Sequence, residues 1–276
     1  MGNLTIYVCH HAPAKVVANE VLQPIHAGAK ISPHKLDMVR DDDGDDNISD
    51  KNRYFCELTA AYWIWKHAKA EYVGMFHYRR FFNFKNDHTV FHRLKDSFLG
   101  KYDITQEKIM EILKDYDVIL SCKMLHFKRK MSLYEAYNKC HNVNDLEKML
   151  DIVNRKYPQI GKTARKTLTE QYTGYGANMM VCRKALFDEY YSFVFDVLFE
   201  LEKEIQPEVA TRSRYQQRTY GFLAERLTNI FFEYKKQADG IKVKEVPILY
   251  WEESPWKWCK YKFKRVWKKV GKSNEQ

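Results

Sequence analysis

Residues 71–82, EYVGMFHYRRFF, combine a strand-forming run with a cluster of basic side chains. The first half of the stretch is rich in β-forming residues, and Gly74 permits another backbone or a ligand to approach closely. His77, Arg79 and Arg80 follow where this run ends. Open α/β sheets bind ligands beyond the carboxyl ends of their strands, and arginine matches the geometry of phosphate. The stretch therefore predicts a strand that ends in a phosphate-binding cluster, with solvated basic residues at a strand edge as an equal alternative.

Strand-forming and helix-forming segments alternate along the rest of the chain. This alternation is typical of an α/β sheet with crossover helices. The expected strands cover 4–10, 71–78, 116–122, a short run within 173–187, and 242–251, and 22–29 is expected to be a second short strand or a turn. The expected helices cover 54–68, 105–115, 132–155, a segment that ends near 204, and 214–236. We find no internal repeat and no linker rich in proline and serine, so residues 1–250 are expected to form one domain.

The composition excludes several classes of protein. The six cysteines are scattered without a CxxC pair, which argues against zinc ribbons and disulfide scaffolds and favours buried thiols of a cytosolic protein. The N-terminus lacks the features of a signal peptide. No segment approaches the roughly 18 consecutive apolar residues of a membrane-spanning helix. We therefore expect a protein that is soluble or peripheral to a membrane.

The positive charge is concentrated near the C-terminus. Residues 256–272 contain eight lysines and arginines and no acid, which leaves only +2 of the net charge of +10 for the rest of the chain. Five aromatic residues interleave with these cations, as in segments that bind anionic membrane surfaces. We expect 251–276 to be a basic aromatic tail that contacts an anionic membrane. A solvated tail and a segment that binds single-stranded nucleic acid are the alternatives.

Two loops contain candidate ligand-binding residues. The acidic segment 41–50, DDDGDDNISD, has the Asp-x-Asp spacing that can hold Mg²⁺ or Mn²⁺, although a flexible solvated loop is favoured. The segment 173–178, TGYGAN, would let a ligand approach the backbone, and Asn178 could bind sugar hydroxyls. A plain turn explains the second loop equally well.

The segment 215–227, YQQRTYGFLAERL, is expected to be helical. Helical spacing places Arg218 and Glu225 on either side of a patch that contains Gly221. Glu225 could act as a general base there. From the residues alone, an ordinary surface ion pair is the favoured interpretation.

Together these segments resemble a bacterial family, domain of unknown function 4422, whose members are linked with capsular and exopolysaccharide biosynthesis glycosyltransferases. The segments that carry the resemblance are IYVCHHAP, PIHAGA, DDNISDKNRYFCELTAAYWIWKH, YVGMFHYRRFF, GANMMVCRKALFDEYYSFVFDVLFELE and YQQRTYGFLAERL, in order over roughly residues 4–250. The resemblance implies a nucleotide-sugar-dependent hexosyltransferase with a GT-A-like nucleotide-diphospho-sugar transferase fold: α/β, with a mainly parallel central sheet and flanking helices. It also implies galactofuranose transfer, with UDP-galactofuranose as the leading donor and inversion at the anomeric carbon.

Carried onto this sequence, the resemblance assigns roles to particular residues. The expected donor-binding residues are His10, Ala12, Asp46, Asn47, His77, Arg79, Arg80, Asn178 and Arg218. Glu225 is the expected catalytic base, with Asp50 as alternative, and His77 is a further catalytic candidate. The cations after the strand are expected to replace a tightly held metal. Asp45 or Asp46 could still supply a site for Mn²⁺ or Mg²⁺.

The resemblance also implies the acceptor. This is a glycan on an undecaprenyl diphosphate carrier, at the cytoplasmic face of the bacterial plasma membrane, where the basic tail would hold the enzyme. Two rival functions remain open. One is a non-enzymatic module that binds nucleic acid or a membrane through the tail, and the other is sugar-phosphate transfer, which would release UMP in place of UDP.

Overall fold

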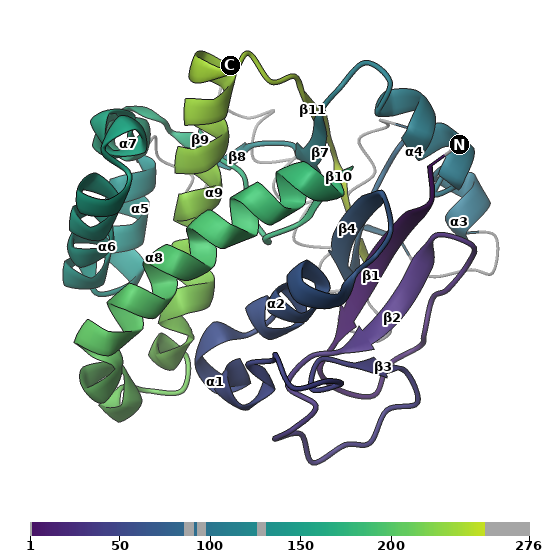
Figure 1. The fold of residues 1–276 in the computed structure, drawn as a ribbon, viewed down its shortest axis with the longest axis horizontal. Coiled ribbons are helices and arrows are strands. Elements are labelled where there is room, and N and C mark those ends of the chain that lie inside the picture. Colours follow the sequence, from purple (N-terminus) through teal and green to yellow (C-terminus); the bar gives the residue numbers. More distant parts are fainter. Residues whose placement is uncertain (1, 86–90, 93–97, 126–130, 252–276) are drawn as a thin grey trace, which may run out of the picture.

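The computed structural model describes residues 2–85, 91–92, 98–125 and 131–251. In this part of the chain, a ten-stranded sheet forms the centre of the molecule (Figure 1). Its strands are β1 Leu4–His10, β2 Leu22–His26, β3 Val39–Arg40, β4 Tyr72–His77, β5 Arg80–Phe82, β6 Phe91–His92, β7 Val118–Ser121, β10 Met180–Arg183, β11 Val243–Val246 and β12 Ile248–Trp251. A separate antiparallel pair consists of β8 Met124–Leu125 and β9 Thr173–Gly174.

The sheet is mixed but mostly parallel. Its main path runs β11-β7-β10-β4-β1-β2-β3, and β12 extends it by pairing with β5 and β6. β1 is parallel to both β2 and β4, and β2 is parallel to β3. β10 runs antiparallel to its neighbours β4 and β7. The predicted α/β fold with a mainly parallel central sheet is therefore confirmed, and the carboxyl ends of β1, β2 and β4 lie at the same edge.

Helices cover both faces of the sheet because its buried strands place apolar side chains on both. Along β1, Ile6 and Val8 point into one core cluster, and Tyr7 and Cys9 point into the other. The helices are α1 Asn52–Phe55, α2 Leu58–His67, α3 Phe98–Lys101, α4 Gln106–Ile112, α5 Leu133–Cys140, α6 Val143–Lys156, α7 Pro158–Glu170, α8 Lys184–Thr211 and α9 Thr219–Ala238, with 3-10 turns η1 Ser49–Lys51 and η2 Gln216–Arg218. Apolar residues of α2, α8 and α9 fill the Tyr7 side, and those of α3 and α4 fill the Ile6 side. Figure 1 shows α5, α6 and α7 beyond α8 and α9, as a further helical layer.

Gly74 sits in the middle of β4 for a steric reason. A Cβ atom at this position would lie 2.8 Å from the carbonyl oxygen of Met180 and 2.8 Å from a methyl carbon of Val181, both in the neighbouring β10. No side chain fits there without moving that strand. The close approach predicted at Gly74 is therefore made by a backbone, and it belongs to the core of the sheet.

Two predicted elements are interrupted at single residues. The helix expected over 54–68 is divided into α1 and α2 at Cys56, which has a φ of 53°. The side-chain amide of Asn52 donates to the Cys56 carbonyl at 2.7 Å and holds this kink. The strand expected over 242–251 is divided into β11 and β12 at Pro247, which has no N–H for the sheet.

The region 132–170 contains more helices than expected. The single helix predicted over 132–155 is two helices, because α5 ends at Cys140 and Asn142 begins α6 by accepting a hydrogen bond from the Asn144 N–H. The sequence prediction also missed α7, which begins with Pro158 at its first position. These helices form the layer that faces away from the sheet.

Within the described residues, no helix is long and apolar enough to cross a membrane. The expectation that most thiols are buried is wrong for this part of the chain. Among the described cysteines, Cys9 and Cys182 are buried, Cys56 and Cys122 are half-buried, and Cys140 is exposed. The predicted tail, 251–276, lies outside the described residues except for Trp251, the last residue of β12.

Candidate functional site

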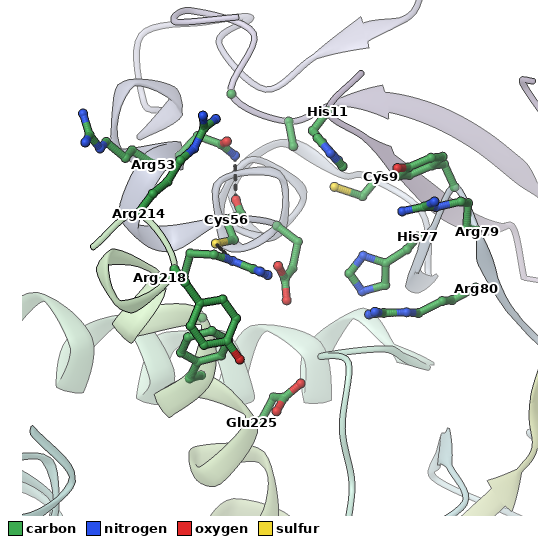
Figure 2. A pocket seen from close by; sticks show the side chains of 18 of the residues that line it. Cys9, His11, Arg53, Cys56, His77, Arg79, Arg80, Arg214, Arg218 and Glu225 are labelled. Carbon is green, nitrogen blue, oxygen red and sulfur yellow. Dashed lines mark hydrogen bonds between the residues drawn. The ribbon is translucent and has the colours of Figure 1, made fainter. Parts of the chain in front are cut away.

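A cavity of about 1070 Å³ opens at the sheet edge where β1 and β4 end. Its volume slightly exceeds the range of about 300–1,000 Å³ that is typical of small-molecule sites. One side, which we call the sheet wall, consists of His11, His77, Tyr78, Arg79 and Arg80. The opposite side, the helical wall, consists of Arg53, His141, Arg214, Tyr215, Arg218 and Phe222. Figure 2 shows the labelled arginines of the two walls on opposite sides of the view.

The lining is strongly basic. Six arginines line the cavity, against two carboxylates, Glu57 and Glu225, so the formal excess among the described residues is four positive charges. These arginines are Arg53, Arg79, Arg80, Arg214, Arg218 and Arg226. A cavity with low-dielectric walls concentrates such a field. The lining therefore selects an anionic ligand.

Arginines of the helical wall bond to neutral groups, whereas the described arginines outside the cavity bond to carboxylates. Each described arginine outside the cavity forms an ion pair with a carboxylate: Arg40, Arg155, Arg165, Arg183 and Arg212. By contrast, Arg53 donates to the Gln217 side chain and Arg218 donates to the Cys56 sulfur, both of which are neutral partners. Their positive charge is thus left for a ligand.

His77 is neutral at the end of β4. Its Nε2 lies 2.6 Å from the Ala177 carbonyl oxygen, which can only accept, so Nε2 carries the proton and donates. Burial lowers the pKa of His77, and the nearby Arg80 lowers it further against the opposing effect of Glu57. The sequence predicted three cations at this position, but the positive charge there rests on Arg79 and Arg80. Burial of an imidazole among arginines favours its uncharged form.

Glu225 reaches the cavity from α9. One carboxylate oxygen accepts the Ala177 N–H at 2.8 Å, and the other lies 3.1 Å from a guanidinium nitrogen of Arg226. Burial raises the pKa of Glu225 above the ordinary value of 4.5, although Arg226 partly opposes this shift. A carboxylate has about four acceptor positions, so each oxygen can still accept a further hydrogen bond. Glu225 is thus a half-buried carboxylate with capacity to take a proton from a ligand.

Glu57 is a second carboxylate of the cavity, and the sequence analysis did not single it out. It precedes α2, directly after the kink at Cys56. One of its oxygens accepts from the side-chain amide of Asn178 at 2.9 Å. Asn178, predicted to bind sugar, is buried, does not line the cavity and instead holds Glu57 in place.

The loop 173–178 joins these groups through its backbone. Ala177 and Asn178 have φ values of 68° and 48°, so the chain turns sharply there. This turn directs the Ala177 carbonyl at His77 and the Ala177 N–H at Glu225. Asn229 of α9 fixes the loop by bonding both the N–H and the carbonyl of Tyr175. The loop therefore positions two side chains of the cavity.

The acidic segment begins with a buried structural residue. Asp41 is fully buried and accepts the N–H groups of Gly28 at 2.7 Å and Ala29 at 3.0 Å, as well as the Ser49 hydroxyl. Gly28, with a φ of 69°, lines the cavity. The favoured interpretation of a flexible solvated loop is therefore wrong for Asp41, which holds a cavity loop in shape.

Other predicted site residues lie outside the cavity lining. His10 is buried, with its ring 5.4 Å from the Tyr78 ring, which itself lines the cavity. Asp46 accepts from the Tyr62 hydroxyl at 2.6 Å, and the Asn47 amide donates to the Gly44 carbonyl at 2.7 Å. Two further residues, Ala12 and Asp50, also lie outside the lining. Of the residues predicted to bind or react with the donor, the cavity brings together His77, Arg79, Arg80, Arg218 and Glu225.

The described side chains do not fit a divalent cation in this cavity. Among the described residues, no three of the types His, Cys, Asp and Glu are grouped so that they could hold a metal ion. Asp45 and Asp46 are exposed outside the cavity, and Asp46 also pairs with Lys66. Hard cations prefer several oxygen ligands, whereas this cavity offers two carboxylates among six arginines.

Several residues that line the cavity were not predicted as site residues from the sequence, namely His11, Arg53, Glu57, His141, Arg214 and Tyr215. His11 is adjacent to a predicted residue, and Arg214 and Tyr215 begin a segment that was predicted to be helical. The basic and aromatic run at 214–218 could have signalled them. Arg53 and His141 have no local signal, because packing of distant helices brings them together.

Replacement of Asp41 by alanine is expected to destabilise the protein by about 3 kcal/mol or more. The substitution leaves the Gly28 and Ala29 N–H groups and the Ser49 hydroxyl buried without their acceptor. Chemical denaturation of the full chain measures this change. Asp45→Asn is the matched control, because Asp45 is exposed in the same segment and should change stability by less than about 0.5 kcal/mol. Equal stability of the two variants would contradict the role given to Asp41.

Comparisons with known proteins agree with this fold. The chain is 32% identical to a solved structure described as an apo WbbM bifunctional glycosyltransferase, with a TM-score of 0.84. The match covers 91% of this chain and 45% of that chain, so this chain spans less than half the length of that protein. No curated protein sequence matches. The sequence model of DUF4422, a domain of unknown function, matches residues 5–237, and the chain therefore belongs to the DUF4422 family.

Proposed function

We propose that this protein is a glycosyltransferase that moves a sugar from a UDP-sugar donor to an acceptor hydroxyl, in a GT-A-like fold. The observation that carries the proposal is that Arg79 and Arg80, which follow the carboxyl end of β4, line the same cavity as Glu225. The two guanidinium groups suit a diphosphate, and the half-buried carboxylate suits a base. The similarity to a chain described as a bifunctional glycosyltransferase supports this chemistry.

On the donor side, the nucleotide would lie against the ends of β1 and β2, at His11 and Gly28. His10 would support this surface from behind, through its contact with Tyr78. Arg79 and Arg80 would bind the diphosphate and stabilise the charge that develops on UDP as it leaves. Preorganised donors of this kind each contribute roughly 3–4 kcal/mol to the stabilisation of a transition state. Neutral His77 has Nδ1 as an acceptor for a sugar hydroxyl, because its Nε2 proton is donated to Ala177.

The transfer itself exchanges one bond for another at the anomeric carbon. The acceptor oxygen forms a bond to this carbon from the face opposite the diphosphate, and the bond from the carbon to the diphosphate oxygen breaks. The bonding electron pair leaves with UDP, whose negative charge faces Arg79 and Arg80. The acceptor hydroxyl proton moves to the Glu225 carboxylate, and the configuration inverts. The raised pKa of Glu225 makes it a stronger base than an ordinary glutamate. Glu57 replaces Asp50 as the second candidate, because Glu57 lines the cavity and Asp50 does not.

The donor sugar is proposed to be galactofuranose, on the basis of the family resemblance. A panel of UDP-galactofuranose, UDP-hexopyranoses, GDP-sugars and CMP-sugars, supplied with lipid-linked acceptors, tests the proposed reaction by chromatography of the nucleotide product. Release of UDP, with UDP-galactofuranose the fastest donor, is expected. Release of UMP would indicate sugar-phosphate transfer and would contradict the proposal. Asp45→Asn, outside the cavity, should retain the wild-type rate.

The acceptor is proposed to be a glycan on an undecaprenyl diphosphate carrier at the cytoplasmic face of the plasma membrane. Residues 251–276 would hold the enzyme at that surface, because cations and aromatic rings alternate along them. Sedimentation with phosphatidylglycerol vesicles tests this role. The full chain should sediment with the vesicles, and a chain that lacks 256–276 should remain in solution. Equal sedimentation of the two chains would contradict the role of the tail.

A further inference from the structure

Three separate segments contribute arginines to the helical wall. Arg53 comes from α1, Arg214 from the segment before η2, and Arg218 from η2. Among the described residues, none of the three forms an ion pair with a carboxylate. Figure 2 shows them across the view from the basic residues of the sheet wall, with Glu225 below both groups. A donor diphosphate bound at the sheet wall would therefore leave these charges for a second anion.

Three aromatic rings accompany these arginines. The ring centroids of His141 and Phe222 are 4.1 Å apart, and those of Tyr215 and Phe222 are 5.2 Å apart. The guanidinium of Arg218 lies 5.2 Å from the centre of the Phe222 ring. The Tyr215 side chain is 55% exposed at the cavity. Rings with an exposed face and a polar handle suit a sugar, and the adjacent arginines suit a phosphate attached to it.

The charge of the two walls also argues for two ligands. Arginines on both sides of one cavity repel one another, and bound anions relieve this repulsion. The cavity, at about 1070 Å³, is larger than most sites for a single small molecule. Glu225 can then meet a hydroxyl group of a molecule held at the helical wall while the donor occupies the sheet wall.

We propose that the helical wall is an acceptor subsite, which binds a phosphate or diphosphate group through Arg53, Arg214 and Arg218. The sugar attached to that group lies against Tyr215 and Phe222, and its reacting hydroxyl faces Glu225. This assignment rests on the proposed function, because it takes the sheet wall as the donor site. Recognition of the acceptor then depends on the phosphate or diphosphate group to which its sugar is attached.

Calorimetry of the full chain tests the subsite with defined probes. UDP is titrated first, and inorganic pyrophosphate is then titrated into the UDP-saturated protein. The wild type is expected to bind pyrophosphate in this second titration. The double substitution of Arg53→Gln and Arg214→Gln should weaken this binding at least tenfold and change the affinity for UDP less than twofold. Arg155→Gln with Arg165→Gln is the matched control, because both arginines lie outside the cavity, and it should change neither titration.

The outcomes separate the subsite from the proposed function. If UDP binds but pyrophosphate does not, or if the double variant binds pyrophosphate as the wild type does, the subsite is contradicted and the donor site stands. If UDP does not bind, the proposed function fails. Pyrophosphate is then titrated into the free protein, where loss of binding in the double variant alone still supports the subsite, and unchanged binding overturns it. Arg214→Gln alone serves if the double variant does not fold, because among the described residues Arg214 forms no hydrogen bond or ion pair that the substitution would remove.

A second probe distinguishes the two sources of the anion. Geranyl diphosphate carries the same charged group on a short prenyl chain, which is soluble in water. Binding at least tenfold tighter than that of pyrophosphate indicates that the subsite accepts a lipid-linked diphosphate. Equal affinities indicate recognition of the diphosphate alone. Either result supports the anion subsite, whereas binding of neither probe overturns it.

Discussion

Replacement of Glu225 by glutamine is expected to lower kcat for sugar transfer by about 10³-fold, with little change in the KM for the donor. General base catalysis contributes roughly 10²–10⁴-fold, and glutamine cannot accept the proton of the acceptor hydroxyl. The amide can still accept the Ala177 N–H with its oxygen, so the loop should remain in place. Steady-state kinetics with the best donor of the panel measures the effect. Near-normal turnover would contradict this role for Glu225.

The pH dependence gives the same residue a second signature. Only the ionised carboxylate accepts a proton, and burial raises the pKa of Glu225 above 4.5. The value of kcat/KM should therefore rise with pH, with an inflection above pH 4.5. The residual activity of the Glu225→Gln variant should not show this rise. Asp50→Asn is the matched control, because Asp50 is exposed outside the cavity and should retain both the rate and the profile. A loss of activity in Asp50→Asn would indicate that Asp50, and not Glu225, is the catalytic base.

The double substitution of Arg79→Gln and Arg80→Gln is expected to lower kcat/KM for the donor by 10³-fold or more. Each arginine would contact the diphosphate in the ground state and more strongly as charge develops on UDP, so both binding and turnover should fall. Arg80→Lys should be intermediate, because lysine keeps the charge but loses the planar fork. Arg183→Gln is the control, since Arg183 pairs with Glu71 away from the cavity. Unchanged affinity for UDP in the double variant would show that the donor does not bind at the sheet wall.

The sequence predicted the parts of this site that depend on local order. Residues 71–82 showed both the strand and the basic cluster that follows it, because an apolar run and its end are visible within twelve residues. The helix predicted over 214–236 begins only at Thr219, and Arg218 lies on the 3-10 turn before it, but Arg218 and Glu225 both line the cavity as predicted. These predictions needed no knowledge of the contacts between distant segments.

The remaining parts depend on such contacts. The charge of His77 could not be predicted, because its lowered pKa arises from burial and from Arg80 in the folded protein. Glu57 enters the cavity at a kink that Asn52 holds, and it is oriented by Asn178, 121 residues away in sequence. Asp41 is one of six aspartates in the segment 41–50, and nothing local distinguishes it from the others. Only the folded chain brings the N–H groups of Gly28 and Ala29 to it.

The central claim is that this cavity binds a uridine nucleotide at the sheet wall, and thermal unfolding of the full chain with UDP tests it most directly. A ligand at about 100 times its dissociation constant stabilises the folded state by roughly 2.7 kcal/mol, which is a clear increase in Tm. We expect this increase with UDP and UDP-galactofuranose, both in EDTA and with Mn²⁺, and not in the variant that lacks Arg79 and Arg80. A Tm that no nucleotide changes, in either condition, would contradict the account and would favour a binding function for the basic tail.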